Sequence, residues 1–291
     1  MAAADLSRFL LLAAIWGSSY LFMRIAVPGF GPVPLVMVRL IGAALFFLPW
    51  LLRPPVRPLL RKHAAKLFFL GALNSAIPFS LLGFSMLRLQ AGFAAILGAT
   101  VPLFAVAIDA LWWRHALSRQ RLCGLALGFF GVVVLAWNHF DFHSGGSGWA
   151  VLAALGASVC YGIGAHFGKF YFKDKPPMLP AAGSMMASAL LITPIGLSVW
   201  PTVLPRWQDW LTAATLAIVC TASAYLLYYR LIVRISATTL TGVTFVIPVF
   251  GVLWGRLFLQ EQITVNIVIG MVIILTGTAF TTGLIGRSRG E

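Results

Sequence analysis

Charged side chains are scarce in this sequence, and acidic ones are the scarcest. Asp, Glu, Lys and Arg make up only 10% of the 291 residues, with 7 acidic side chains, while 60% of the residues are apolar. Soluble domains carry about a quarter charged residues, so this chain has too few charges to cover a surface in water. The composition therefore excludes a soluble enzyme and a disordered binding segment.

The sequence also has few cysteines and no motif for a common cofactor. Cys123, Cys160 and Cys220 lie in apolar runs without disulfide or metal spacing. They are interpreted as buried reduced thiols, which excludes a disulfide-stabilised secreted scaffold. No Walker loop, dinucleotide fingerprint, zinc-binding His/Glu set or nucleophile elbow is present. We therefore expect no cofactor, no metal, no ATP-driven pumping and no enzyme, although a membrane-embedded lipid enzyme stays open as an alternative.

Long apolar runs fill most of the chain. A bilayer core about 30 Å thick takes roughly 20 helical residues to cross, and ten such spans account for the length. The sequence therefore predicts an all-α membrane protein with ten transmembrane helices, and the first is interpreted as a retained helix because no small-residue cleavage site follows it. The runs cover residues 9–27, 33–52, 67–87, 91–113, 120–137, 149–169, 180–199, 209–230, 236–258 and 264–284.

The positive residues alternate between loops in a way that sets the orientation. With the N-terminus in the cytoplasm, the loops and helix ends assigned to the inside hold most of the Lys and Arg residues. The outer set is only Arg24, Arg39, Arg88, Arg206 and Arg256. The positive-inside rule then predicts ten spans with both termini cytoplasmic, in a bacterial inner membrane. The net charge of +14 is attributed to loops that face anionic lipid, so no nucleic-acid partner is expected.

The second half of the chain repeats the first at an offset of 146 residues. Identical residues at this offset include Ala91/Ala237, Pro102/Pro248, Phe104/Phe250, Gly124/Gly270 and Gly131/Gly277. Each half holds five spans, an odd number, so the copies enter the membrane from opposite sides. We predict two inverted repeats around a central cavity, at 1–140 and 149–291, joined by an external Gly/Ser linker at 141–148. This architecture is typical of alternating-access transporters, although it also permits a channel.

Several segments resemble a known family. The segment 13–20 (AAIWGSSY), Arg39 in the second span, the proline-bearing ninth span, Glu261 with Thr264, and Gly270 with Gly277 resemble the drug/metabolite transporter superfamily, in its EamA-type ten-helix branch. Overall the sequence also resembles the bacterial aromatic amino-acid exporters in that branch, on general similarity and not on a particular motif. One departure is His115, which stands where the second repeat has Glu261. The resemblance implies a basket in which helices 1, 3, 4, 6, 8 and 9 surround a cavity, with helices 5 and 10 outside it.

Polar and aromatic residues near the middle of spans are candidates for binding substrate. Helical spacing places Ser75 with Phe79 on one face, and Thr221 with Tyr225 on the matching face of the repeat. The candidate substrate-binding residues are Ser75, Pro78, Phe79, Tyr161, Thr221 and Tyr225. Helix-to-helix hydrogen bonding by the hydroxyls, and simple packing by the rings, remain the alternatives.

The two matched prolines are candidates for a moving part. Proline lacks an N–H, so Pro102 and Pro248 free the carbonyls of Gly98 and Thr244. In lipid such a carbonyl has to face protein or water. We predict that helices 4 and 9 bend here and change shape during transport, and a fixed packing kink is the alternative.

Asp109 and His166 are the candidate proton or polar site, because ionisable residues within a span are usually functional. Local pairing with Arg114 and Lys169 is the structural alternative. Neither residue lies at mid-depth, which favours facilitated diffusion over proton coupling. The sequence thus favours an exporter of small organic metabolites, with amino acids including aromatic ones as partners, while a proton-coupled multidrug or metabolite efflux carrier is the alternative. Glycines in helices 5 and 10 are expected to pack within one chain, so we expect a monomer in the lipid bilayer.

Overall fold

The computed structural model describes residues 3–113, 117–143, 145–232, 234–235 and 237–285, and these form helices with short connections. Ten helical spans in this part of the chain are long and apolar enough to cross a membrane, as the sequence predicts. Spans 1 and 2 are α1 (Ala3–Phe30) and α2 (Pro32–Leu51), and the loop helix α3 (Val56–Lys62) follows. Span 3 comprises α4 (Ala64–Gly71), η1 (Ala72–Ala76) and α5 (Ile77–Ser85), and span 4 comprises α6 (Ala91–Gly98) and α7 (Val101–Trp113).

The remaining spans follow the same order. Span 5 is α8 (Arg119–Ala136), extended by the short helix η2 (Trp137–His139). Spans 6 and 7 are α9 (Gly148–Phe172) and α10 (Met178–Ser198). Span 8 comprises α11 (Trp207–Ala217), η3 (Ile218–Ser223) and α12 (Ala224–Ile232). Span 9 comprises α13 (Ala237–Thr241) and α14 (Val243–Leu259), and span 10 is α15 (Val265–Thr282).

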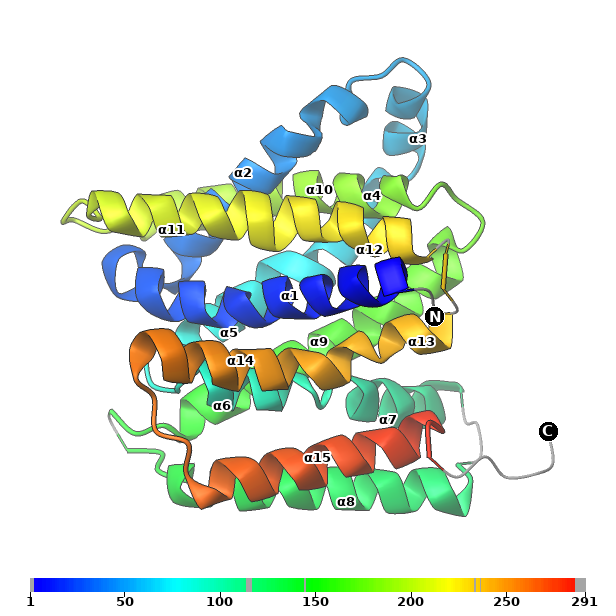
Figure 1. Ribbon diagram of the computed structural model, residues 1–291. Coiled ribbons are helices and arrows are strands. Elements are labelled where there is room, and N and C mark those ends of the chain that lie inside the picture. Colours follow the sequence, from blue (N-terminus) through cyan, green and yellow to red (C-terminus); the bar gives the residue numbers. More distant parts are fainter. Residues whose placement is uncertain (1–2, 114–116, 144, 233, 236, 286–291) are drawn as a thin grey trace.

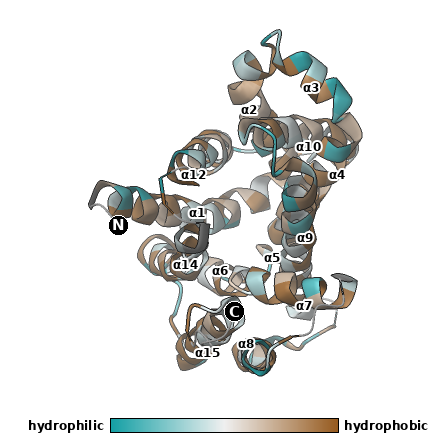
Figure 2. Ribbon diagram, turned by 90° about the vertical axis from the view of Figure 1, so that its right-hand side faces the viewer, coloured by the Kyte–Doolittle hydropathy of each residue, from teal (hydrophilic) through white to brown (hydrophobic). Residues whose placement is uncertain are grey.

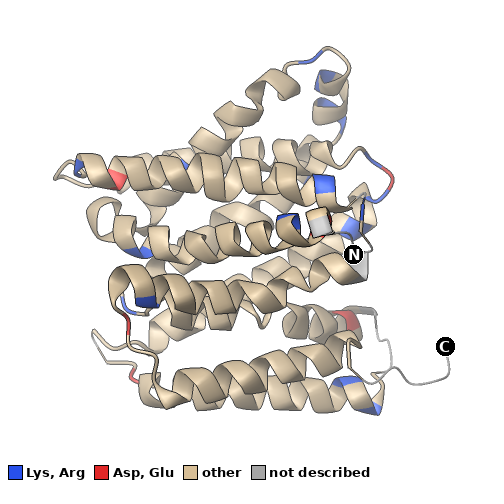
Figure 3. Ribbon diagram, in the orientation of Figure 1, with Lys and Arg blue, Asp and Glu red and all other residues tan. Residues whose placement is uncertain are grey.

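Apart from the tilted α2, the spans lie roughly parallel to one another (Figure 1), and the view along the bundle shows α8 and α15 together at one edge (Figure 2). Most Lys, Arg, Asp and Glu residues lie near the two ends of the bundle (Figure 3). Between the ends the outer surface is largely apolar, as a helix exposed to lipid requires. The beginning of α1 and the end of α15 lie at the same end of the bundle, which we call the terminal end. The opposite end is the far end.

The inverted repeat is visible in a feature that the sequence did not reveal. Span 3 contains a π-helical segment at Ala72–Ala76, and span 8 contains another at Ile218–Ser223. The offset of 146 residues places the start of the first segment on the start of the second. π-helical turns are rare and are found mostly at functional sites. Their matched position supports the prediction of two related halves and draws attention to the centre of spans 3 and 8.

Spans 5 and 10 form a closely packed pair at one edge of the bundle (Figure 1). A Cβ atom added to Gly277 would lie 2.6 Å from the Cα of Gly128 and 2.7 Å from the carbonyl oxygen of Gly124. Gly131 lies similarly against Ile274. These glycines therefore let the backbones of α8 and α15 approach within a single chain, as the sequence analysis expects.

The interpretation of all three cysteines as buried thiols is wrong for two of them. Cys220 is buried, Cys160 is partly exposed and Cys123 is exposed. Cys123 lies on α8 at the edge of the bundle, where one side of the helix has no protein neighbour and faces the lipid instead. Apolar surroundings in the sequence do not distinguish burial in protein from contact with lipid.

Candidate functional site

Arg39 is buried inside the membrane-spanning part of the protein. It is the eighth residue of α2, roughly 10 Å along the helix axis, and only 4% of its surface is exposed. Its Nε donates a hydrogen bond to Thr221 Oγ1 at 2.8 Å, and its Nη1 donates to Met23 Sδ at 3.4 Å. Its Cζ lies 3.9 Å from the centroid of the Phe79 ring, a cation–π arrangement. Arg39 was counted with the outer set of charges, and the structure places it inside span 2 instead of in a loop, a depth that a count of positive residues does not give.

Thr221 fixes the orientation of this guanidinium. It lies in the π-helical segment of span 8, and its hydroxyl donates to the carbonyl oxygen of Leu216 at 2.8 Å, five residues earlier. That bond uses the only hydroxyl proton, so the oxygen lone pairs face Arg39. Thr221 therefore acts as an acceptor that positions Arg39 from the opposite repeat.

Aromatic and thiol side chains surround the same guanidinium. Tyr20, Tyr161, Tyr225 and Cys220 lie close enough to interact with it electrostatically. They come from spans 1, 6 and 8. We call Arg39, Thr221, Phe79, Tyr20, Tyr161 and Tyr225 the Arg39 centre.

Further aromatic contacts extend the Arg39 centre along span 1. The Trp16 ring meets the Tyr225 ring edge to face at 6.3 Å between centroids and lies 5.7 Å from that of Tyr228. Close by, the Cys220 sulfur lies 3.6 Å from the Ser18 hydroxyl. The hydroxyl of Ser19 is buried without a nitrogen or oxygen partner among the described residues. Span 1 thus adds aromatic faces and the hydroxyls of Ser18 and Ser19, both next to the Cys220 thiol.

Four of the six candidate substrate residues gather at this centre, and two do not. Phe79, Thr221, Tyr225 and Tyr161 belong to it, as described above. Ser75 is fully buried, and its hydroxyl points to Met185 Sδ on α10 at 3.8 Å. The candidate Pro78 is the second residue of α5, just after the π-helical segment, and is also buried. Ser75 and Phe79 thus contact different neighbours, since Ser75 lies against α10 and Phe79 against Arg39 of α2.

Arg39 was identified only as part of a family resemblance, yet it anchors the site. A signal was present in the sequence: a lone arginine within a long apolar run, with no acidic residue one helical turn away. Intramembrane charges of this kind mark functional sites by default.

No described acidic side chain neutralises Arg39. Glu291 lies outside the described residues, and each of the other six is located elsewhere. They are Asp5, beside Arg8; Asp109, beside His166; Asp141, beside His143; Asp174, in the loop after α9; Asp209, beside Arg206; and Glu261, at the start of α6. A buried cation without an anion is costly, so an arginine left in this state points to a negatively charged partner from outside the described chain.

Span 4 is interrupted next to Pro102. It breaks between α6 and α7, two residues before the proline. The carbonyl of Leu97 accepts hydrogen bonds from the Thr100 hydroxyl at 2.6 Å and the Ser158 hydroxyl at 3.3 Å. The carbonyl of Ala99 accepts from Thr278 at 3.2 Å. Side chains from spans 4, 6 and 10 therefore satisfy the backbone at this break.

Pro248 and Thr244, the candidates in span 9 for the moving part, do not form a simple proline bend. Span 9 breaks at Gly242, and α14 continues through Pro248. Thr244 is the second residue of α14, and its hydroxyl donates to the Thr241 carbonyl at 2.8 Å. The Tyr20 hydroxyl lies directly against the Cα of Gly98, so the break in span 4 contacts the Arg39 centre. Movement at these positions stays a prediction.

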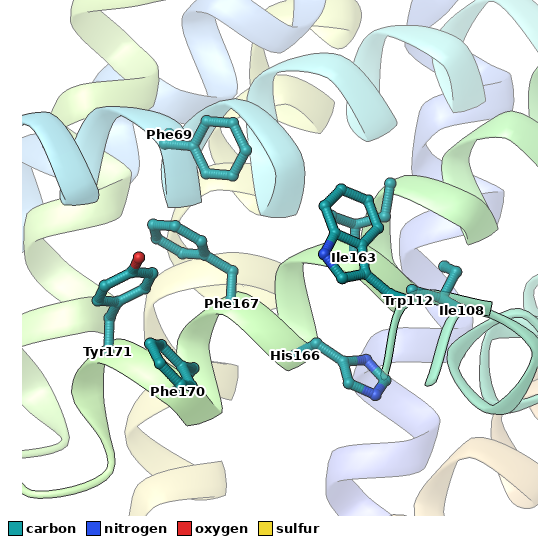
Figure 4. Close-up of a pocket in the computed structure, with 8 residues that line it drawn as sticks. All are labelled: Phe69, Ile108, Trp112, Ile163, His166, Phe167, Phe170 and Tyr171. Carbon is teal, nitrogen blue, oxygen red and sulfur yellow. The ribbon is translucent and has the colours of Figure 1, made fainter. Parts of the chain in front are cut away.

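Asp109 and His166 meet each other across spans 4 and 6. The distance between His166 Nε2 and Asp109 Oδ1 is 3.3 Å, and His166 Nδ1 lies 3.0 Å from the Gly162 carbonyl oxygen. His166 also lines a pocket of about 340 Å³ toward the terminal end. Figure 4 shows the aromatic side chains that line it, with Phe69 and Trp112 from spans 3 and 4. This pocket does not contain Arg39.

At the far end, spans 4 and 9 are joined by Glu261. Its carboxylate accepts hydrogen bonds from the backbone N–H groups of Ala91 at 2.7 Å and Gly92 at 3.1 Å. A carboxylate at a helix N-terminus is favoured by the unpaired N–H groups and the helix dipole. Glu261 thus closes the start of α6 from the opposite repeat. Its sequence counterpart in the first repeat, His115, lies outside the described residues.

The sequence model of the EamA-like transporter family matches this chain twice, over residues 6–137 and 148–283. The chain belongs to the EamA-like transporter family. The resemblance to this branch of the drug/metabolite transporter superfamily is therefore confirmed, and the protein is a multi-pass membrane transporter.

Several curated relatives match this chain over almost their whole length. The uncharacterized inner membrane transporter YedA of Escherichia coli (strain K12) is 27% identical over 91% of this chain and 88% of its own length. The uncharacterized transporter YoaV of Bacillus subtilis (strain 168) is 22% identical over 94% of this chain and 95% of its own. A solved crystal structure is similar over 98% of both chains, with a TM-score of 0.68 at 18% identity, which shows similarity of the fold alone.

Proposed function

We propose that this protein exports small organic metabolites, amino acids including aromatic ones among them, by alternating access through the Arg39 centre. The observation that carries the proposal is a buried arginine that lacks a described carboxylate partner and is surrounded by aromatic rings. The guanidinium is suited to a carboxylate, because it offers planar paired N–H donors. The rings are suited to an apolar or aromatic side chain.

The inverted repeat supports alternating access as the mechanism. Substrate sites in such transporters lie near the bilayer midplane between the repeats. The Arg39 centre draws Arg39 and Phe79 from the first repeat and Thr221 and Tyr225 from the second. In the proposed setting the protein lies in a bacterial inner membrane, works as a monomer, and has its terminal end in the cytoplasm.

The test is counterflow into proteoliposomes loaded with phenylalanine. We expect saturable exchange of labelled phenylalanine, accelerated by unlabelled amino acid on the other side, as a carrier requires. Flux that rises linearly with concentration, without acceleration from the other side, would indicate a channel. Absence of exchange for every amino acid in a panel of aromatic and aliphatic ones would contradict the proposed substrate class.

A proton-coupled carrier is the second candidate, and the contact between Asp109 and His166 favours it. A pair of titratable groups that joins spans 4 and 6 is suited to sensing protonation while the helices move. We nevertheless favour facilitated diffusion, since the pair lies apart from the Arg39 centre. Imposing a pH gradient across the proteoliposomes should change the exchange rate less than twofold. A larger acceleration that the variant Asp109→Asn abolishes would support proton coupling instead.

A further inference from the structure

The Arg39 centre contains a positive charge and unpaired hydrogen-bond donors, without a negative group among the described residues to match them. Arg39 carries five N–H donors, and the described residues provide only two hydrogen-bond acceptors for them, Thr221 Oγ1 and Met23 Sδ. The bond to Met23 is weak, because a thioether sulfur is a poor acceptor. At least three donors on a side chain that is 4% exposed are thus left for a ligand.

The Arg39 centre provides nothing comparable for a positive group. The described acidic residues are located elsewhere, at the ends of spans, in loops, or beside His166 in the case of Asp109. An ammonium group placed next to a bound carboxylate would lie close to the guanidinium, and like charges in a medium of low polarity repel strongly. The face of Phe79, which could attract a cation, is already occupied by Arg39.

We infer that the centre selects aromatic and other apolar monocarboxylates that carry a net charge of −1, in preference to zwitterionic amino acids with the same side chain. This inference rests on the proposed function and narrows its substrate class. The substrate carboxylate lies against Arg39. Hydroxyl donors come from Tyr20, Tyr161 and Tyr225, and the apolar part of the substrate lies among the aromatic rings. A phosphate monoester fits less well, since its second negative charge has no second cation in the centre.

The net charge has a consequence for the direction of transport. A monoanion that leaves a cell with a negative interior moves down the electrical gradient. One elementary charge over 100 mV corresponds to an equilibrium concentration ratio of about fifty-fold. Export of such a substrate therefore needs no proton or ATP coupling. A zwitterion carries no net charge and gains nothing from the potential.

The test compares four probes that share a phenyl ring and differ in charge. Phenylpyruvate is a monoanion, phenylalanine a zwitterion, phenethylamine a cation and phenyl phosphate a dianion. Each competes with labelled phenylalanine during counterflow in proteoliposomes of the full-length protein. We expect phenylpyruvate to compete at a concentration at least tenfold lower than phenylalanine, and phenethylamine and phenyl phosphate to compete more weakly than both. A potassium diffusion potential, negative inside, should accelerate efflux of labelled phenylpyruvate and leave that of phenylalanine unchanged.

Substitutions of Arg39 test whether this residue causes the preference for the monoanion. The variant Arg39→Gln should lose the tenfold preference, while Arg39→Lys should keep its sign with weaker binding, because lysine retains the charge without the paired donors. Arg53→Gln, in the exposed loop after α2, is the control and should behave as wild type. Elution as one symmetric peak in detergent checks that each variant is folded. If Arg39→Gln does not fold, the comparison of Arg39→Lys with wild type carries the test.

The outcomes separate this inference from the proposed function. Exchange of phenylalanine with equal or weaker competition by phenylpyruvate would overturn the inference and leave the proposed function standing. Stronger competition by phenyl phosphate would also overturn it, in favour of a phosphorylated substrate. An unchanged preference for phenylpyruvate in Arg39→Gln would show that another part of the protein recognises the substrate charge, and it would overturn the inference. Failure of all four probes to exchange or compete would overturn the inference, and failure of the whole panel of amino acids as well would contradict the proposed function itself.

Discussion

Glu261 should control how readily the far end of the transporter opens. The residue follows α14 in the second repeat, and its carboxylate accepts two backbone hydrogen bonds from the start of α6 in the first repeat. The variant Glu261→Gln keeps the size of the side chain. It removes the negative charge and replaces one acceptor oxygen with an NH₂ group that faces a donor.

The size of the effect follows from the lost interactions. A hydrogen bond to a charged group contributes about 1.5–3 kcal/mol, and one of the two is lost outright. The helix dipole adds about 0.3–1 kcal/mol at a partly exposed site. Solvent screening reduces the sum, so we expect about 1.5–3 kcal/mol. If the contact exists only while the far end is closed, the ratio of open to closed molecules rises by roughly 10- to 150-fold.

The assay measures the separation of spans 4 and 9 at the far end. Spin labels on cysteines at Arg88 and Gln262, both exposed at this end, report the distance by pulsed dipolar spectroscopy. Glu261→Gln should shift the population toward longer distances. The control is Asp141→Asn, an exposed carboxylate at the same end that contacts His143 locally. An unchanged distance distribution in Glu261→Gln, or an equal shift in the control, would refute the reasoning.

Three further predictions follow from the packing and polar contacts. Gly277→Ala should destabilise the protein by about 1–3 kcal/mol, because the new methyl group meets backbone atoms. In the control Gly156→Ala the methyl group makes an ordinary 3.5 Å contact with a leucine, so this variant should be neutral or stabilised, and thermal unfolding in detergent distinguishes the two. Thr221→Val should raise the KM for exchange about tenfold by leaving the Nε donor of Arg39 unpaired, and a serine at the same position should restore it. Burial, followed by nearby lysines, lowers the pKa of His63 below its usual 6.5. The unfolded chain therefore takes up more protons than the folded one, and the stability of the protein should fall as the pH drops below about 6.5. Replacing His63 with Phe should flatten this pH dependence of the melting temperature, and an equally steep dependence would contradict the prediction.

The ten spans and the repeat were predictable because their signals are local in the sequence. Hydropathy marks each span, and paired residues such as Gly131 and Gly277 reveal the packing of spans 5 and 10. The neighbours of Arg39 were not predictable, since they come from spans 1, 3, 6 and 8, and no rule of spacing connects these spans. The π-helical turns were also hidden, because one extra residue in a hydrogen-bonded turn leaves no clear mark in composition.

The candidate residues show the same division. Phe79 and Tyr225 are candidates because of their aromatic character and matched depth, and both lie at the Arg39 centre. Ser75 is a candidate because α-helical spacing places it on the face of Phe79, and in the structure its hydroxyl lies against Met185 of α10. The neighbours of a residue in the middle of a span therefore need coordinates, whereas its type and approximate depth can be taken from the sequence.

Cys220 provides the most direct measurement of access to the Arg39 centre from both sides. With Cys123 and Cys160 replaced by alanine, it is the only thiol, and it is buried beside Arg39. Alternating access predicts that a small membrane-impermeant thiol reagent modifies Cys220 when added to either side of oriented vesicles, and that substrate slows the reaction from both. Modification from one side alone, or none from either, would contradict alternating access through this centre.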